Sequence, residues 1–143
     1  MNVQLNHIII PAHDKHASAK FLADILGVPV GQPVDPFVPV TLSNAVTLDY
    51  MDRDDFHSHH CAFLVDEDEF DAAFTRIRQS GITYYADPGH EHPGEINHYW
   101  GGRGVYFEDP NGHNMEILTR VPVETTTVRE ATAGEAGVQS RGE

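Results

Sequence analysis

The pattern of apolar and polar positions predicts that one succession of elements occurs twice along the chain. In the first half, a strand-like run at residues 4–11 (QLNHIIIP) precedes a helix over residues 14–26, where apolar side chains recur at helical spacing. Gly27 follows, at a position where the end of a helix favours a left-handed residue. Two strand-like runs, residues 37–42 (FVPVTL) and 45–51 (AVTLDYM), complete this half.

The second half repeats the pattern. A strand is predicted at residues 59–65 (HHCAFLV), followed by a helix over residues 66–80 that opens with a capping-box pattern. Three further strands are predicted at residues 82–86 (ITYYA), 97–108 (NHYWGGRGVYFE) and 113–120 (HNMEILTR). An Asp-Pro-Asn-Gly turn joins the last two strands.

The two halves together predict an α+β fold of two tandem βαβββ modules. Their strands would form one curved mixed sheet around a central cup, with the helices outside. Module one covers about residues 1–53, where a short strand at residues 28–32 (VPVGQ) completes the order, and module two covers about residues 57–121. The single domain therefore spans residues 1–121, and the Thr-, Glu- and Gly-rich residues 122–143 are predicted to be a disordered tail.

Composition narrows the range of partners. The 143 residues carry a formal net charge of −13, which argues against nucleic acid or an anionic membrane surface, because both need a basic footprint. A single cysteine, Cys61, excludes an internal disulfide. The sequence shows no signal peptide and no apolar run near the ~20 residues of a membrane span, so a cytoplasmic protein is expected. Ten histidines are the first hint of metal or acid–base chemistry.

Two of the histidines and one glutamate are candidates for a metal site. His7 and His60 occupy the same position in the first strand of each half, and side-chain alternation turns both toward the predicted cup. Glu116 lies between Met115 and Ile117 on the last strand, where a carboxylate is costly unless a positive charge meets it. Two histidines and one carboxylate can hold a metal with open coordination positions.

Each of these residues also has a plainer interpretation. His7 could be a hydrogen-bonded histidine of the core or edge, His60 a member of a solvated HSHH cluster, and Glu116 an exposed residue of an edge strand. Arg103 could meet an anionic substrate group or be solvated. Five other histidines are expected on the surface or in loops: His57, His59, His90, His92 and His113.

The paired modules, their first-strand histidines and the DPNGHNME segment resemble the vicinal-oxygen-chelate superfamily, which includes glyoxalases, bleomycin-resistance proteins and extradiol dioxygenases. The resemblance covers about residues 1–120. One stretch is similar to the extradiol dioxygenase signature, whose elements here are His98, six intervening residues, Val105-Tyr106, two residues, Asp109-Pro110-Asn111-Gly112, three residues and Glu116.

This resemblance implies an Fe(II) dioxygenase that cleaves a small, catechol-like substrate with O₂. By resemblance, His7, His60 and Glu116 would bind the iron, Tyr106 would hydrogen-bond the bound substrate or oxygen, and His98 would stand close to the site. Mn²⁺, Zn²⁺ or Ni²⁺ are alternative metals. The resemblance also implies a homodimer, and the site could form within one chain or across two.

Two other functions stay open. A glyoxalase-like lyase or isomerase, or a thiol transferase, would use a divalent metal without redox chemistry. Glyoxalases of the superfamily take a fourth ligand from the last strand of module one, where the matching position is expected to be Thr47, with Asp49 reached by a register shift. The third function is a metal-free drug-binding protein with aromatic walls at Tyr99, Trp100 and Tyr106.

Overall fold

The structure is a computed structural model that describes residues 2–122, and it confirms the α+β fold with two tandem modules. The first module consists of β1 (His7–Ala12), α1 (Lys15–Leu26), β2 (Phe37–Thr41) and β3 (Thr47–Asp52). The second consists of β4 (His60–Leu64), α2 (Glu67–Ser80), β5 (Tyr84–Tyr85), the 3-10 helix η1 (Tyr99–Gly101), β6 (Gly104–Glu108) and β7 (Asn114–Leu118). The tail predicted over residues 122–143 lies almost entirely outside the described residues.

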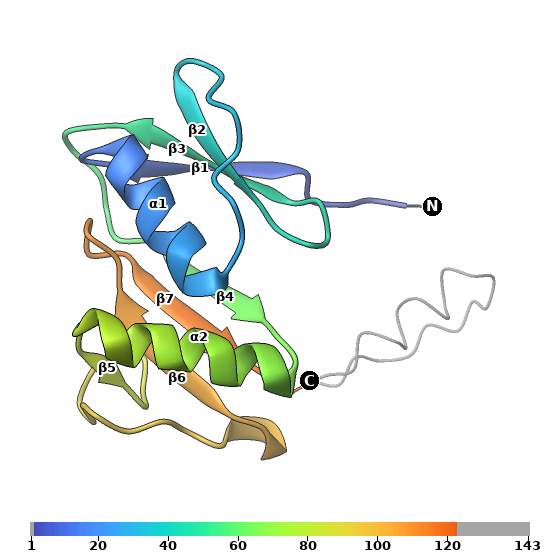
Figure 1. Ribbon diagram of the computed structural model, residues 1–143, viewed down its shortest axis with the longest axis vertical. Helices are drawn as coiled ribbons and strands as arrows, with labels where there is room; N and C mark the ends of the chain where they lie inside the picture. Colours follow the sequence, from blue (N-terminus) through green and yellow to red (C-terminus); the bar gives the residue numbers. More distant parts are fainter. Residues whose placement is uncertain (1, 123–143) are drawn as a thin grey trace.

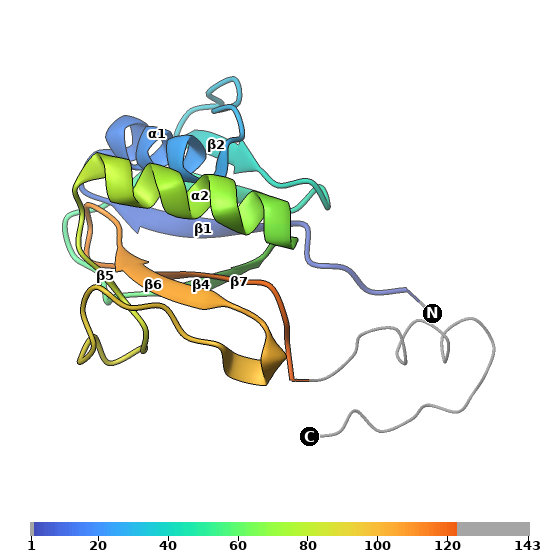
Figure 2. The same cartoon turned by 60° about the horizontal axis from the view of Figure 1, so that its bottom comes forward.

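Each module forms its own mixed sheet. The strand order is β1-β3-β2 in the first sheet and β4-β7-β6-β5 in the second, and the first strand of each module pairs in parallel with its last. Figure 1 shows the two modules stacked with α1 and α2 side by side, and Figure 2 shows both helices on the same side of the molecule. No ladder joins β1 to β4 within residues 2–122, so both are edge strands and the predicted continuous sheet is not made by one chain.

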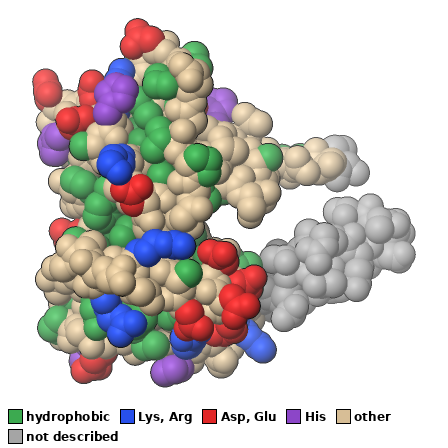
Figure 3. Space-filling model, viewed as in Figure 1, with side chains coloured by type: hydrophobic (Ala, Val, Ile, Leu, Met, Phe, Trp, Pro, Cys, Tyr) green, Lys and Arg blue, Asp and Glu red, His purple; other side chains and the backbone are tan. Residues whose placement is uncertain are grey.

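Both helices begin and end as the sequence predicts. The carboxylate of Asp14 accepts a hydrogen bond from the Ala17 amide at 3.1 Å, and Asp66 accepts one from the Glu69 amide at 2.8 Å. Left-handed glycines follow both helices, with φ of 75° at Gly27. Acidic side chains gather over the first turn of α2 (Figure 3), where their negative charges interact favourably with the positive end of the helix dipole.

Two predicted strands are wrong in extent. The run at residues 28–32 contributes only an isolated bridge between Val30 and Val40. The predicted strand at residues 97–108 is interrupted by η1, and regular pairing starts at Gly104. The cause is local: Trp100 and Gly101 have φ of 60° and 80°, and two successive left-handed residues cannot continue an extended strand.

One hydrophobic cluster runs through both modules. Phe21 of α1 packs on Phe107 of β6 with ring centroids 6.2 Å apart. Arg76 of α2 donates from Nη1 to the carbonyl of Ile25 at 3.0 Å, so a side chain of module two satisfies the C-terminal end of α1. Within the described residues, no helix combines the length and the apolar run that crossing a membrane requires.

The turn between β6 and β7 is docked into module one. Asn111 accepts a hydrogen bond from the His13 amide at 2.8 Å and donates from Nδ2 to the Ser18 hydroxyl at 2.9 Å. Asp109 holds the turn itself, since its Oδ1 accepts from the amides of Asn111 and His113, each at 2.9 Å. The turn is therefore a joint between the modules as well as a connection between strands.

His113 is the centre of this joint, and its predicted surface location is wrong. The side chain is 0% exposed. Its Nε2 donates to the Pro11 carbonyl at the end of β1 at 2.8 Å, and its Nδ1 accepts from the His59 amide at 2.9 Å. These two partners require the neutral imidazole with the proton on Nε2. A histidine in a polar sequence context is thus a buried link between modules.

We expect His113→Ala to lower the free energy of unfolding by about 3 kcal/mol, because it leaves a cavity and removes the partners of a buried carbonyl and a part-buried amide. Urea unfolding followed by circular dichroism measures the change. His16→Ala, on the exposed face of α1, is the matched control and should change stability little. An equal effect of both substitutions would show that His113 does not link the modules.

Candidate metal centre

The face of the second sheet that α2 leaves uncovered carries the candidate site. Strand register aligns Glu116 of β7 with Ala62 of β4 on one side and with Tyr106 of β6 on the other. Because side chains alternate, His60, two positions before Ala62, projects from the same face as Glu116. The opposite face is apolar and packs under the helices, with Phe63, Phe107, Met115 and Ile117 buried.

His60 and Glu116 are in direct contact. The His60 Nε2 donates to the Glu116 Oε1 at 2.9 Å. Glu116 is only 7% exposed, whereas half of the His60 side chain is open to solvent. The imidazole N–H therefore supplies a hydrogen-bond donor to the buried carboxylate on this strand.

The geometry of this pair fits a metal. Two ligands at right angles, each about 2.1 Å from an ion, have donor atoms about 3.0 Å apart. The observed separation of 2.9 Å is that of an ordinary hydrogen bond and is also compatible with that spacing, so both atoms could serve as ligands of one ion. An imidazole nitrogen and a carboxylate oxygen are also donors that Fe²⁺, Mn²⁺ and Zn²⁺ accept.

Tyr106 lies beside the His60–Glu116 pair. Its ring centroid lies 6.0 Å from that of His60, and its side chain is buried beside Glu116. Burial, followed by the negative charge of Glu116 and a hydrogen bond to it, raises the pKa of the Tyr106 phenol well above its ordinary value. The phenol is consequently a neutral hydrogen-bond donor beside the candidate ligands.

His7 lies elsewhere in the chain. It is exposed at the start of β1, and its Nδ1 donates to the Asn6 side chain at 2.9 Å. Within residues 2–122, no three His, Cys, Asp or Glu side chains converge closely enough to hold one ion. One copy of the chain thus brings together Glu116 and His60 but not His7.

The strand register corrects the expected position of a fourth ligand. Ile9 of β1 pairs with Asp49 of β3, as Ala62 of β4 pairs with Glu116 of β7. Asp49 therefore matches Glu116 without any register shift, and Thr47 matches Asn114 instead. The sequence comparison of the two halves missed this because it aligned strands by their pattern and could not see which residues pair.

Two further candidate site residues, His98 and Arg103, make hydrogen bonds or ion pairs with nearby protein groups. The His98 Nδ1 donates to the Gly102 carbonyl at 3.2 Å, so one ring nitrogen stabilises its own turn. Arg103 donates to Glu67 and also pairs with Asp71, each at 2.8 Å, while its guanidinium lies 4.5 Å from the centre of the Phe70 ring. Arg103 therefore joins the residue before β6 to α2 and is not free for an anionic substrate.

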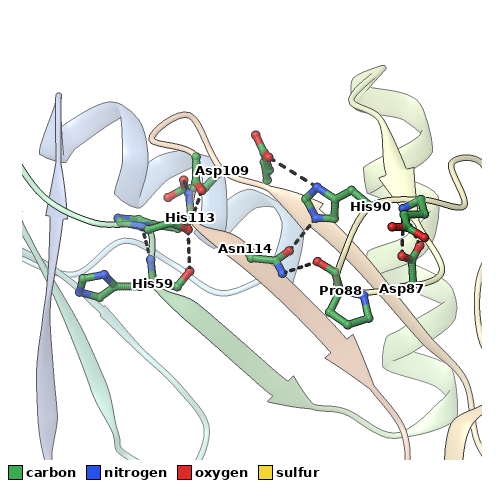
Figure 4. Close-up of polar contacts among 11 residues, drawn as sticks. His59, Asp87, Pro88, His90, Asp109, His113 and Asn114 are labelled. Atoms are coloured by element: carbon green, nitrogen blue, oxygen red, sulfur yellow. Dashed lines mark hydrogen bonds and ion pairs between the residues drawn. The ribbon is translucent and has the colours of Figure 1, made fainter.

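A histidine-rich loop, which contains His90 and His92, borders the same face of the second sheet. The sequence pattern did not predict the contacts that hold this loop against the sheet. His90 stacks on Tyr85 at 4.1 Å with the rings 4° from parallel, and its Nε2 donates to Asn114 at 2.9 Å (Figure 4). Asn114 in turn donates to the Pro88 carbonyl at 3.3 Å. Asn114 is two residues before Glu116 on the same side of β7, so simple alternation could have identified it.

The chain is similar to a known protein superfamily and to several solved structures. The model of the Glyoxalase/Bleomycin resistance protein/Dioxygenase superfamily matches residues 4–117. The solved structure of oxidase ChaP-H2 is similar, with 63% identity and a TM-score of 0.83 over 85% of this chain and 96% of that one. Oxidase ChaP-H1 has 53% identity and a TM-score of 0.82, covering 84% and 98%.

A curated relative is the metallothiol transferase FosB of Shouchella clausii (strain KSM-K16). It is 34% identical over 74 residues, which are 52% of this chain. The matched segment spans only 47% of FosB, about half its length.

We expect metal to stabilise the protein through Glu116. Adding Fe²⁺ without oxygen, or Mn²⁺, at about 100 times its dissociation constant should raise the free energy of unfolding by about 2.7 kcal/mol. Glu116→Gln should remove most of this increase, because a neutral amide is a poor metal ligand. Thermal unfolding with and without metal measures it.

Glu108→Gln is the matched control, since Glu108 lies on the neighbouring strand and is exposed. It should retain the full metal-dependent increase. Equal increases in both variants would place the metal somewhere other than at Glu116.

Proposed function

On the premise that the chain belongs to the Glyoxalase/Bleomycin resistance protein/Dioxygenase superfamily, we propose that it is an Fe(II)-dependent oxygenase of the extradiol type. Its substrate would be a small catechol-like aromatic. The family and the relatives support a metal-dependent enzyme of this superfamily. The observation that carries the finer proposal is the His60–Glu116 pair at 2.9 Å with the Tyr106 phenol beside it. The likeness to two oxidases is a second support.

The protein side chains would have separate tasks. His60 and Glu116 would hold the metal and leave it able to bind substrate. Bound ferrous iron would supply binding sites for a diol and for O₂ next to each other. Tyr106 would donate a hydrogen bond to an oxygen atom of the substrate, and it is fixed for that task by the ladder between β6 and β7. In the overall reaction, one ring C–C bond beside the diol breaks and both atoms of O₂ enter the product.

The third ligand, His7, would come from a second copy of the chain. β1 is an edge strand whose first half is open, with Ile8 41% and Ile9 42% exposed. β4, the edge strand of the other sheet, exposes Leu64 by 60%. Such apolar edges readily pair with another chain. Placing β1 of one copy along β4 of another would cover both edges and bring His7 toward the His60–Glu116 pair.

This assembly predicts complementation between two inactive variants. His7→Ala and His60→Ala should each lose tightly bound metal. If dimers of the two are allowed to exchange subunits in equal amounts, half become mixed dimers with one intact site, so about a quarter of the wild-type metal should return. Metal analysis after desalting measures the recovery. A site within one chain would recover none.

The reaction itself is tested with catechol. Anaerobically purified protein loaded with Fe²⁺ should consume one O₂ per catechol and release a yellow ring-opened product. Tyr106→Phe should lower the turnover rate by about 10²-fold or more, as loss of a transition-state donor does, while iron content stays unchanged. Oxygen uptake and absorbance measure both. Full metal content without any oxygen uptake would overturn the oxygenase assignment.

The second candidate is a lyase or isomerase that uses a metal without redox chemistry, and the position of Asp49 favours it. The register makes Asp49 the module-one counterpart of Glu116, which would give two histidines and two carboxylates. In the oxygen-uptake assay, Asp49→Asn should retain metal and turnover if the oxygenase assignment holds. Loss of metal in this variant, with no oxygen uptake by the wild type, would support the second candidate.

A further inference from the structure

Backbone strain in this chain is concentrated at the border of the candidate site. Within residues 2–122, three non-glycine residues have positive φ: Ala45, His90 and Trp100. Ala45 closes the hairpin between β2 and β3, where such a conformation is ordinary. The other two lie in the segments that flank the open face of the second sheet. Strained conformations of large residues persist where the surrounding structure enforces them, and they are common at ligand sites.

The strain at Trp100 is not explained by packing. Trp100 is 56% exposed and its neighbour Tyr99 is 42% exposed, although aromatic side chains of this size gain most from burial. The turn that carries them is closed by the Gly102 amide, which donates to the Tyr99 carbonyl at 2.9 Å. Two large aromatic rings are thus exposed to solvent on a hydrogen-bonded turn.

Asn97 is the residue that holds this turn. Its side chain is 7% exposed, and its Oδ1 accepts from the Tyr99 amide at 3.1 Å. Its Nδ2 donates to the Ala86 carbonyl at 2.8 Å, at the start of the histidine-rich loop. Its backbone pairs with Gly104 in both directions, at 2.9 and 3.0 Å. A side chain on Gly104 would come within 2.8 Å of Asn97, so the two are packed as closely as they can be.

This turn lies beside the candidate metal ligands. Gly104, to which Asn97 is paired, is two residues before Tyr106 on β6, a distance of about 7 Å along a strand. The phenol of Tyr99 is an electrostatic neighbour of the Tyr106 phenol. An aromatic ring bound over His60 and Glu116 would therefore be within reach of the turn.

We propose that Asn97 is a positioning residue and that the Tyr99–Trp100 turn it holds is the aromatic wall against which the ligand ring packs. This inference rests on the proposed function only in taking the ligand to be an aromatic diol. Asn97 would act through the turn and would touch neither the metal nor the diol.

Binding of 2,3-dihydroxynaphthalene to the full-length, iron-loaded protein under nitrogen tests the proposal, because no turnover occurs there. Calorimetry should show that Trp100→Ala weakens binding roughly three- to tenfold, the effect of one lost aromatic contact, whereas Trp100→Phe stays within about twofold. Asn97→Asp keeps an acceptor for the Tyr99 amide but places a charge against the Ala86 carbonyl. It should weaken binding to a similar extent while iron content is unchanged.

Trp100 is the single tryptophan of the chain, so its fluorescence reports on this turn alone. Asn97→Asp should lower the fluorescence anisotropy of Trp100 and increase its quenching by acrylamide. Thr75→Ala is the matched control, because it deletes a side-chain hydrogen bond of 2.8 Å to a backbone carbonyl on α2, away from the open face. It should change neither the fluorescence nor the binding.

Unchanged binding by Trp100→Ala would overturn the aromatic wall. A change of oligomeric state in that variant, with binding intact, would also overturn it by showing that a second copy covers the turn. Unchanged Trp100 fluorescence in folded Asn97→Asp would remove Asn97 from its positioning role. If the wild type binds the probe through Trp100 yet consumes no oxygen with catechol, the proposed reaction fails and this inference stands.

Discussion

The docking of the Asp109–His113 turn into module one is the interaction on which the arrangement of both sheets depends. His113 links the end of β1 to the start of β4 through two hydrogen bonds, and Asn111 adds two more to α1 and the residues before it. The same turn starts β7, so it sets the register that aligns Glu116 with Ala62 and Tyr106. A single segment therefore fixes how the modules meet and where the buried carboxylate lies.

This joint also explains why one copy holds only part of the predicted ligand set. It ties the modules together at Pro11, near the C-terminal end of β1, whereas His7 is four residues away, about 13 Å along the strand. The C-terminal half of β1 is buried, and the N-terminal half, which begins with His7, is exposed. Within residues 2–122, Glu116 thus has one histidine partner, His60, while His7 lies on β1, an apolar edge strand. Burial of the carboxylate and exposure of the edge have the same structural origin.

Features governed by neighbouring residues could be predicted from the sequence. The helices, their Asp14 and Asp66 caps and the left-handed Gly27 follow from short-range preferences. The convergence of His60 and Glu116 followed from strand alternation, since both strands are regular. Burial of His113 and the match of Asp49 to Glu116 could not be predicted, because both depend on which distant residues become partners.

The sequence pattern failed most clearly around residues 98–102, where a strand was predicted and the 3-10 helix η1 lies instead. Asn97 accepts a hydrogen bond from the Tyr99 amide there, and Asn114 bonds the ring of His90 in the neighbouring loop. Trp100 and His90 both have positive φ. A large residue with positive φ goes against its local preference, and the contacts around it must hold it there. Both segments border the face that carries Glu116. Local sequence preference is therefore overridden beside the candidate site, as it also is at the buried His113.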